Sequence, residues 1–228
     1  MKKNLYDGFE GDKLKDFWDL RKLEEGSFKL QSRIARKGKK SVKITIKKGD
    51  RIEKCKNCKT SERDELVERK ELGPEEGKSY EYSFSVYIPK NFPIVHTRLV
   101  IAQWKQNEMD DKVNVDNPII ALRYVDDVLR ITLQTSKEKV NLFKKRGDIR
   151  GKWIDFKFHL KFTRKKSGFV KAWMNRKKII DFKGVTAYSE KYGYSKPGYF
   201  YFKMGLYRDR MDKPMTIYFD EYKKRELK

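Results

Sequence analysis

Strict alternation of apolar and polar side chains is the feature that most constrains how this chain can fold. It is clearest over Trp153–Thr163, with the sequence WIDFKFHLKFT. The apolar positions are Ile154, Phe156, Phe158, Leu160 and Phe162, and the polar positions that follow them are Asp155, Lys157, His159, Lys161 and Thr163. Because successive side chains of a strand point to opposite faces, this stretch predicts a β-strand with one buried face.

Shorter stretches of the same kind recur along the chain, while helical periodicity is nearly absent. Turn signals made of Gly, Pro, Asn and Asp separate them. The further strands that we expect are 27–35, 41–47, 63–67, 80–88, 97–105, 119–125, 129–134, 169–174, 178–182, 201–209 and 216–222. This pattern predicts an all-β fold, an antiparallel β-jelly-roll sandwich with a concave groove, and one domain over residues 1–228.

The stretch Tyr201–Asp209, YFKMGLYRD, has two faces of different chemistry. The residues expected in the core between the sheets are its apolar side chains and three from the longest alternating strand, namely Phe202, Met204, Leu206, Phe156, Phe158 and Leu160. Tyr201, Lys203, Gly205 and Tyr207 share the other face, where the glycine leaves room between a cation and two phenols. We interpret this face as a binding surface, although an ordinary half-buried strand shows the same alternation.

The charge balance points to a polyanionic partner. The chain carries 56 Lys and Arg against 33 Asp and Glu, a net charge of +23 that opposes compaction unless a partner offsets it. Nucleic acid, an anionic membrane surface and an acidic polysaccharide all fit this charge. Most aromatic residues occupy inward positions and no nucleic-acid-binding motif is present, so nucleic acid is not favoured. No apolar run is long enough to cross a bilayer.

Neither the cysteines nor the acidic residues form a recognisable metal motif. Cys55 and Cys58 make a single CxxC without a second Cys or His pair, which fits a loop disulfide or an incidental pair better than a zinc site. The acidic residues after Gln106 do not have EF-hand spacing. They are Glu108, Asp110, Asp111 and Asp116. We therefore expect no required metal or cofactor, and a structural Ca²⁺ stays open.

Three stretches carry a family resemblance: Arg63-Asp64-Glu65-Leu66, Gln103-Trp104-Lys105 and YFKMGLYR from Tyr201 to Arg208. In this order they resemble the strand motifs of β-jelly-roll polysaccharide lyases, a concanavalin-like fold. Family 7 alginate lyases carry the same three motifs. The sequence between the motifs is similar to that of the heparin lyase and glucuronan lyase group. The resemblance covers roughly residues 27 to 222.

The resemblance implies an enzyme that cleaves a uronate-containing polysaccharide by β-elimination, cutting within glucuronan or alginate chains. Heparin- or heparan-type cleavage and non-catalytic binding of an acidic polysaccharide are the alternatives. Gln103 and Arg63 match the amide and guanidinium that neutralise the substrate carboxylate, and Tyr207 matches the group that protonates the departing oxygen. The expected substrate-binding residues are Lys203, Tyr201, Arg208, Arg123 and Glu65.

The chain departs from the family pattern at Lys105, where relatives that use a histidine as the base have that histidine. Three candidates for the base stay open. Lys105 qualifies if neighbouring cations lower its pKa, Tyr207 qualifies if cations favour its phenolate, and His96 precedes the Gln103 strand. His159 lies in mid-strand, and we expect it to be structural.

The resemblance also implies a secreted or periplasmic protein, although the chain as given has no signal peptide. We expect a monomer that does not bind nucleic acid or a membrane. The sequence does not identify the uronate, which is read by loops such as 106–117 and 186–198.

Overall fold

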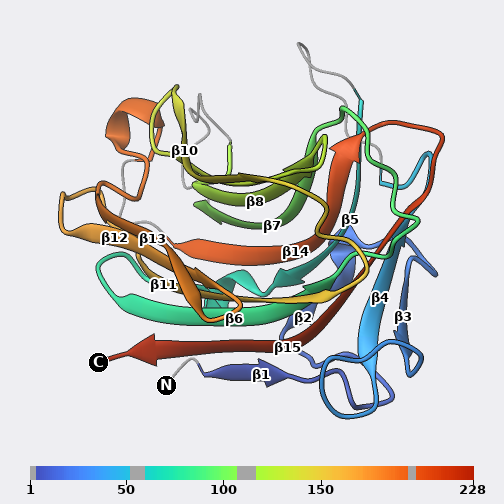
Figure 1. Ribbon diagram of the computed structural model, residues 1–228. Coiled ribbons are helices and arrows are strands. Elements are labelled where there is room, and N and C mark those ends of the chain that lie inside the picture. Colours follow the sequence, from blue (N-terminus) through green and yellow to red (C-terminus); the bar gives the residue numbers. More distant parts are fainter. Residues whose placement is uncertain (1–3, 52–59, 107–116, 195–198) are drawn as a thin grey trace.

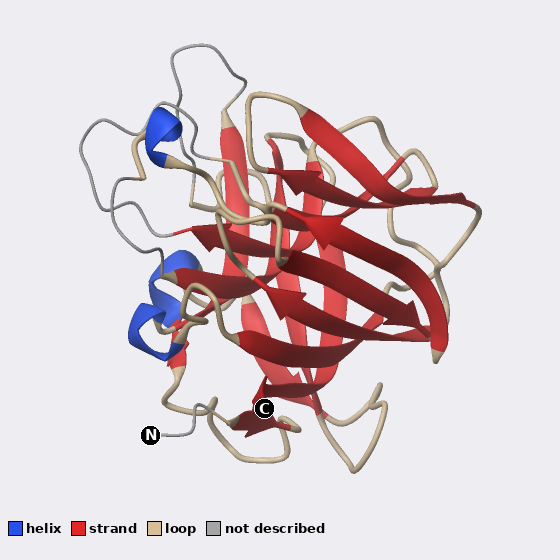
Figure 2. Ribbon diagram, turned by 90° about the vertical axis from the view of Figure 1, so that its left-hand side faces the viewer, coloured by secondary structure: helices blue, strands red, loops and turns tan. Residues whose placement is uncertain are grey.

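The computed structural model describes residues 4–51, 60–106, 117–194 and 199–228, and it consists of two antiparallel sheets stacked face to face (Figure 1). The helical residues in these ranges form short 3-10 turns at Leu20–Lys22, Lys70–Leu72 and Glu190–Tyr192. Figure 2 shows these turns beside the strands. The all-β jelly-roll prediction is confirmed.

We call the first sheet the back sheet. Its strand order is β13-β12-β11-β6-β15-β4-β3, with β1 paired to β15. The bounds of its strands are β1 Leu5–Asp7, β3 Phe28–Gln31, β4 Ser41–Ile46, β6 Ser79–Tyr87, β11 Trp153–Lys161, β12 Gly168–Met174, β13 Lys177–Gly184 and β15 Met215–Leu227.

The second sheet, the front sheet, has the order β10-β9-β8-β7-β14-β5-β2. Its strands are β2 Trp18–Asp19, β5 Ser61–Glu68, β7 Leu99–Gln106, β8 Ile120–Val125, β9 Val128–Gln134, β10 Lys139–Arg146 and β14 Phe200–Asp209. Its strands are bowed, and their hollow side faces away from the back sheet (Figure 1).

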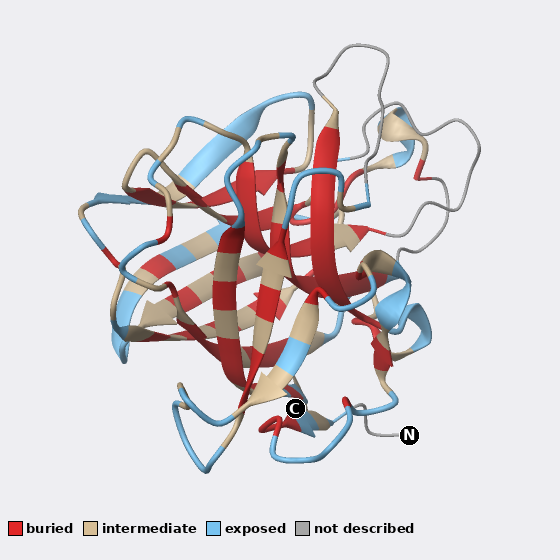
Figure 3. Cartoon of the chain, turned by 90° about the vertical axis from the view of Figure 1, so that its right-hand side faces the viewer, coloured by how far each residue is buried: buried red, intermediate tan, exposed pale blue. Residues whose placement is uncertain are grey.

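The core lies between the two sheets and is rich in aromatic rings. Trp104 of the front sheet packs against Phe158 of the back sheet at 4.7 Å between ring centroids, and against Phe202 at 4.8 Å. The alternation of buried and partly exposed residues follows the strands (Figure 3). The six core residues expected from the sequence are at most 2% exposed, so that prediction is confirmed.

Strand β5 is unusual because every residue of it is buried, although its sequence is SERDELVE. Three of its acidic side chains, Glu62, Glu65 and Glu68, lie beside cations from other strands. Glu68 pairs with Lys224 of β15, and both side chains are fully buried. The hydroxyls of Tyr82 and Tyr222 also donate to Glu68, at 3.1 and 3.4 Å. This group ties the front sheet to the back sheet.

The strand predictions fail where no alternating buried face exists. Strand β10 was not expected because its residues are exposed or half-buried, with Val140 54% exposed. The two- and three-residue strands β2 and β1 are too short to show a period. The strand expected over 27–35 ends at Gln31, and the one expected over 63–67 extends over Ser61–Glu68.

Replacing Lys224 with Ala should lower the free energy of unfolding by about 3–5 kcal/mol, because it leaves the buried Glu68 carboxylate without its cation. Urea denaturation measures the change. Lys223→Ala, at the exposed neighbouring position, is the control and should stay within about 0.5 kcal/mol of the wild type. Equal effects of the two substitutions would contradict a structural role for the Glu68–Lys224 pair.

Candidate active site

The three sequence motifs come together on the outer face of the front sheet. Strand β14 lies between β5 and β7, so the motifs occupy three adjacent strands. Tyr207 lies opposite Arg63, and Lys203 lies opposite Gln103. Residues separated by more than a hundred positions in the sequence therefore share one surface.

Gly205 allows β14 to lie very close to the backbone of β5. It lies opposite Glu65, and an added Cβ would be 2.2 Å from the Asp64 carbonyl oxygen and 2.8 Å from the Glu65 Cα. Its φ of 149° also disfavours other residues. Above this glycine the Gln103 amide donates a 2.5 Å hydrogen bond to Glu65. The absence of a side chain at position 205 lets β14 approach the β5 backbone closely, and β5 carries the Glu65 side chain of that bond.

Glu65 is the centre of a buried charge cluster. It is 1% exposed, and its second carboxylate oxygen lies 3.7 Å from Arg63 Nη1 and 4.0 Å from Lys203 Nζ. Burial lowers the pKa of Lys203 to about 8; Glu65 opposes this shift, whereas Arg63 and Lys105 add to it. The Lys203 ammonium therefore loses its proton at a lower pH than a solvent-exposed lysine does.

Tyr207 is held between two arginines. The Arg63 guanidinium lies 4.5 Å from the centroid of its ring, and Arg98 Nη1 donates to its hydroxyl oxygen at 2.9 Å. An arginine can only donate, so this contact does not use the hydroxyl proton of Tyr207. Arg98 is fixed in turn by Asp209 at 2.8 Å. Sequence reasoning missed Arg98, because its partners lie 109 and 111 positions away.

Lys105 and Tyr201 lie opposite each other on β7 and β14, on the same face. Lys105 is partly exposed, whereas Tyr201 is 8% exposed. The ammonium groups of Lys70 and Lys203 lie 5.0 and 5.3 Å from the Tyr201 ring centroid. The ring of Tyr201 thus supports Lys203, while Lys105 is the more accessible amine.

The two histidines lie apart from this group. The side chain of His96 is 90% exposed and its Nδ1 is 2.5 Å from an oxygen of Asp126, in the turn between β8 and β9. His159 is on the outer face of the back sheet, 2.8 Å from Glu81 and packed on Trp173. That face is on the opposite side of the sandwich.

Arg123 and Arg208, both expected to bind substrate, have different environments. Arg123 lies on the outer face of β8, and burial together with Arg98 and Arg130 lowers its pKa to about 10. Arg208 is fully buried, pairs with Glu62 at 2.9 Å and donates to the Met211 and Lys213 carbonyls. The expectation that Arg208 contacts substrate is wrong, because its guanidinium is enclosed within the protein.

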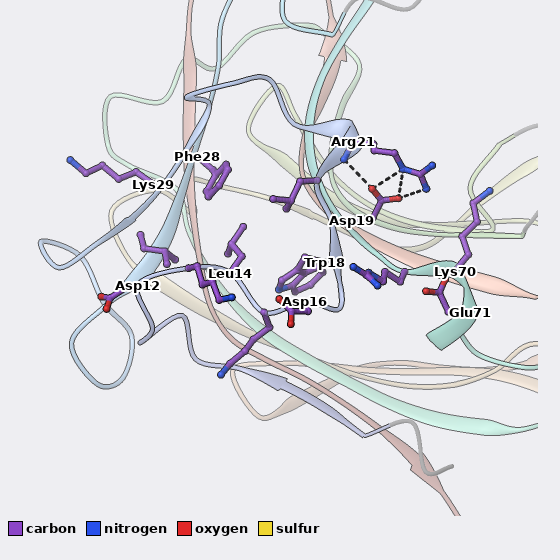
Figure 4. Close-up of a pocket in the computed structure, with 15 residues that line it drawn as sticks. Asp12, Leu14, Asp16, Trp18, Asp19, Arg21, Phe28, Lys29, Lys70 and Glu71 are labelled. Atoms are coloured by element: carbon purple, nitrogen blue, oxygen red, sulfur yellow. Dashed lines mark hydrogen bonds and ion pairs between the residues drawn. The ribbon is translucent and has the colours of Figure 1, made fainter.

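A cavity of about 1040 Å³ lies beside the 3-10 turns Leu20–Lys22 and Lys70–Leu72 (Figure 4), and Tyr207 is not among the residues that line it. Its lining mixes acids with cations, and Asp19 accepts hydrogen bonds from both the backbone N–H and the guanidinium of Arg21. Trp18 is 3% exposed, with its indole N–H bonded to Asp7. The mixed charge of this cavity suits a polyanion less well than the cationic face of the front sheet.

Among the described residues, no group of three or more His, Cys, Asp and Glu side chains is placed to hold a metal ion. The residues considered for Ca²⁺ and for a disulfide lie outside the described ranges, namely Glu108, Asp110, Asp111, Asp116, Cys55 and Cys58. In the same described part of the chain, no helix has the length and apolar character needed to cross a membrane.

The Gly205→Ala substitution should lower the free energy of unfolding by at least about 1–3 kcal/mol, because its methyl group overlaps the β5 backbone. Gly26→Ala is the matched control: it also has a positive φ, yet no heavy atom lies within 4 Å of the added carbon. It should cost only about 1 kcal/mol. Urea denaturation of both variants tests this, and a loss at position 205 no larger than at position 26 would contradict the steric account.

Solved structures with this fold include lyases that act on acidic polysaccharides. The endo-β-1,4-glucuronan lyase from the fungus Trichoderma reesei matches with a TM-score of 0.74 at 17% identity, over 98% of this chain and 95% of that one. Alginate lyase AlgAT5 of polysaccharide lyase family 7 matches with a TM-score of 0.59 at 14% identity, over 90% and 85%. Alginate lyase A1-II′ of the same family gives 0.58 at 13% identity, over 94% and 85%. These likenesses establish the fold.

The sequence has no match among curated proteins. A family model described as "Polysaccharide lyase" matches residues 5–223. This range includes all three motifs and both sheets of the sandwich. The chain belongs to the polysaccharide lyase family.

Proposed function

We propose that this lyase cleaves an acidic, uronate-containing polysaccharide by β-elimination on the outer face of the front sheet. The convergence of Arg63, Gln103 and Tyr207 on three adjacent strands carries the proposal. In the reaction a base removes the proton at C5 of the uronate, the bond from C4 to the linking oxygen breaks, and that oxygen takes up a proton. A C4–C5 double bond conjugated to the carboxylate remains.

The first task is to stabilise the negative charge that develops on the substrate carboxylate. Gln103 has two amide hydrogens, of which one is used by Glu65, so the other can donate to the substrate. Arg63 supplies a positive charge close to Tyr207. Glu65 is not in the substrate's path. We assign it the role of holding Gln103, Arg63 and Lys203 in place.

The second task is proton transfer. Tyr207 donates its hydroxyl proton to the departing oxygen, since Arg98 occupies the phenolic oxygen only as a donor. For the base, Lys105 and Tyr207 lie on this face, and Lys203 joins them because its pKa is lowered to about 8 by burial. His96 is less suitable, because its contact with Asp126 lies in the β8–β9 turn.

Two features support glucuronan or alginate as substrates, with cleavage inside the chain. The glucuronan lyase and alginate lyases named above share the fold. An open sheet face also accepts a polymer along its length more readily than a closed pocket does. No metal or cofactor is needed in this scheme, because Gln103 and the cations perform the neutralisation.

Tyr207→Phe should reduce turnover at least about 100-fold while polymer binding persists, because the ring stays and the proton donor is lost. The substitution also removes the acceptor of one Arg98 hydrogen bond, but Asp209 still pairs with Arg98. Turnover is measured as the rise in ultraviolet absorbance from the new double bond, over a panel of glucuronan, alginate and heparan chains. Tyr199→Phe, an exposed tyrosine outside the site, is the control. His159→Ala should affect stability alone. Near-wild-type elimination by Tyr207→Phe would refute its role, and binding without elimination by the wild type would indicate a non-catalytic module.

Turnover should rise with pH through about 8. Lys203 is protonated below its folded-state pKa of about 8 and neutral above it, and only the neutral amine accepts a proton. Lys203→Arg keeps a positive charge at every pH and should remove the rise in turnover near pH 8. Lys105→Arg tests in the same way whether the Lys105 amine is the base. A profile with a maximum near pH 6.5, together with loss of activity in His96→Ala, would instead identify His96 as the base.

A second candidate substrate, a sulfated uronate chain of the heparin type, is favoured by one observation. Arg123 on β8 lies opposite Arg130 on β9. Burial lowers the pKa of the nearby Lys139, and the charges of Arg123 and Arg98 lower it further. Like charges placed opposite each other destabilise a sheet, so this group is suited to more than one negative charge.

If the substrate is sulfated, Arg130→Gln should lower kcat/KM at least about tenfold on a heparan chain but little on the same chain after desulfation. Arg33→Gln, an exposed arginine on the β3–β4 loop, is the control. Equal losses on the sulfated and desulfated chains would favour a plain polyuronate and leave the lyase proposal intact.

A further inference from the structure

The outer face of the back sheet, on the side opposite Tyr207, is also cationic and aromatic. Over β6, β11, β12, β13 and β15 the outward cations outnumber the acids on the same face, which are Glu81, Asp155, Asp181 and Asp220. These cations are Lys157, Lys161, Lys171, Lys178, Lys183, Lys223 and Arg225. Two of the chain's four tryptophans, Trp153 and Trp173, lie on this face as well.

A row of three partly exposed rings crosses adjacent strands at one end of this face. Tyr87 lies opposite both Trp153 and Tyr218, with ring centroids 5.6 and 5.9 Å apart. None of the three points into the core between the sheets. Leaving this much aromatic surface in contact with water is unfavourable unless a ligand covers it.

A second row, in which lysines alternate with a serine and a tryptophan, runs across the same strands parallel to the row of rings. Ser83 lies between Lys223 and Lys157, and Trp173 lies between Lys157 and Lys178. The ammonium groups of Lys157 and Lys178 are 4.7 and 5.8 Å from the Trp173 ring centroid. Strands are about 4.8 Å apart, so the three lysines recur at roughly 10 Å intervals. A polymer with a regular acidic repeat can place one carboxylate at each of them.

A cavity of about 690 Å³ separates the two rows. Its lining includes Ser83, Lys223 and Arg36. Two acids also line it, and both have cationic partners: Asp155 is held by two hydrogen bonds from Arg36, at 2.9 and 2.8 Å, and Glu221 lies 3.8 Å from Lys37 Nζ. Serine hydroxyls, three cations and two acids paired with cations therefore line this hollow, and Lys223 is the cation among them that also belongs to the lysine row.

We propose that the outer face of the back sheet is a second binding surface for an acidic polysaccharide, distinct from the catalytic face. The rings contact the apolar faces of the sugars, the lysines pair with the carboxylates, and the cavity takes one or two sugar units. The inference rests on the proposed function in one respect: the bound chain is the polymer that the enzyme cleaves. Such a surface holds the enzyme on a long chain between cleavage events.

Lys157→Gln/Lys223→Gln and Trp173→Ala test this surface. Lys47→Gln/Lys90→Gln removes the same charge at exposed positions elsewhere and is the control. We expect both test variants to bind the long polymer about tenfold more weakly at low salt, with kcat and KM on a tetrasaccharide unchanged. Affinity is measured by calorimetry in the Tyr207→Phe background, so that no cleavage occurs, and urea denaturation confirms that each variant is folded.

Polymer affinity within twofold of the parent, or a loss equal to that of the control, would overturn the proposal. A single-stranded nucleic acid of matched length is the competing ligand, and a loss of affinity confined to it would also overturn the assignment to polysaccharide. If the wild type cleaves no polyuronate, the lyase proposal fails by itself, whereas the binding comparison still decides whether this second surface exists.

Discussion

The structure depends on the burial of a charged strand. Strand β5 carries Glu62, Asp64, Glu65 and Glu68, and each is at most 1% exposed. Isolated carboxylates are too costly to bury, so Glu62, Glu65 and Glu68 require cations at fixed places on other strands. Glu62 holds Arg208, Glu68 holds Lys224, and Glu65 lies between Arg63 and Lys203. The same requirement joins the sheets on one side of β5 and assembles the reactive face on the other.

Much of this arrangement could be predicted from the sequence, since period-two alternation identifies which side chains share a face. It placed Phe202 and Phe158 in the core and Tyr207 with Lys203 on the surface. The same alternation also indicates that Arg208 points inward. Arg208 has the inward parity of Leu206, and a cation at an inward position implies a buried partner such as Glu62.

Other features depend on contacts that no local pattern encodes. Arg98 lies at the edge of a predicted strand, and its meeting with Tyr207 follows from the pairing of β7 with β14 and from an irregularity in that pairing between Met204 and Tyr207. The lowered pKa of Lys203 likewise arises from burial, which depends on the packed structure. Strand β10 has no buried face, so its side chains carry no alternation to detect.

The glycine at position 205 has a consequence for how this enzyme can be altered by engineering. A side chain at this position would overlap the β5 backbone at Asp64 and Glu65. The placing of Glu65, and of the Gln103 amide that hydrogen-bonds to it, therefore depends on an atom that is missing. A mutational library that varies neighbouring positions can adjust specificity, whereas one that varies this position removes the support of the amide. Position 205 therefore tolerates substitution poorly, although its glycine has no side chain that could react with a substrate.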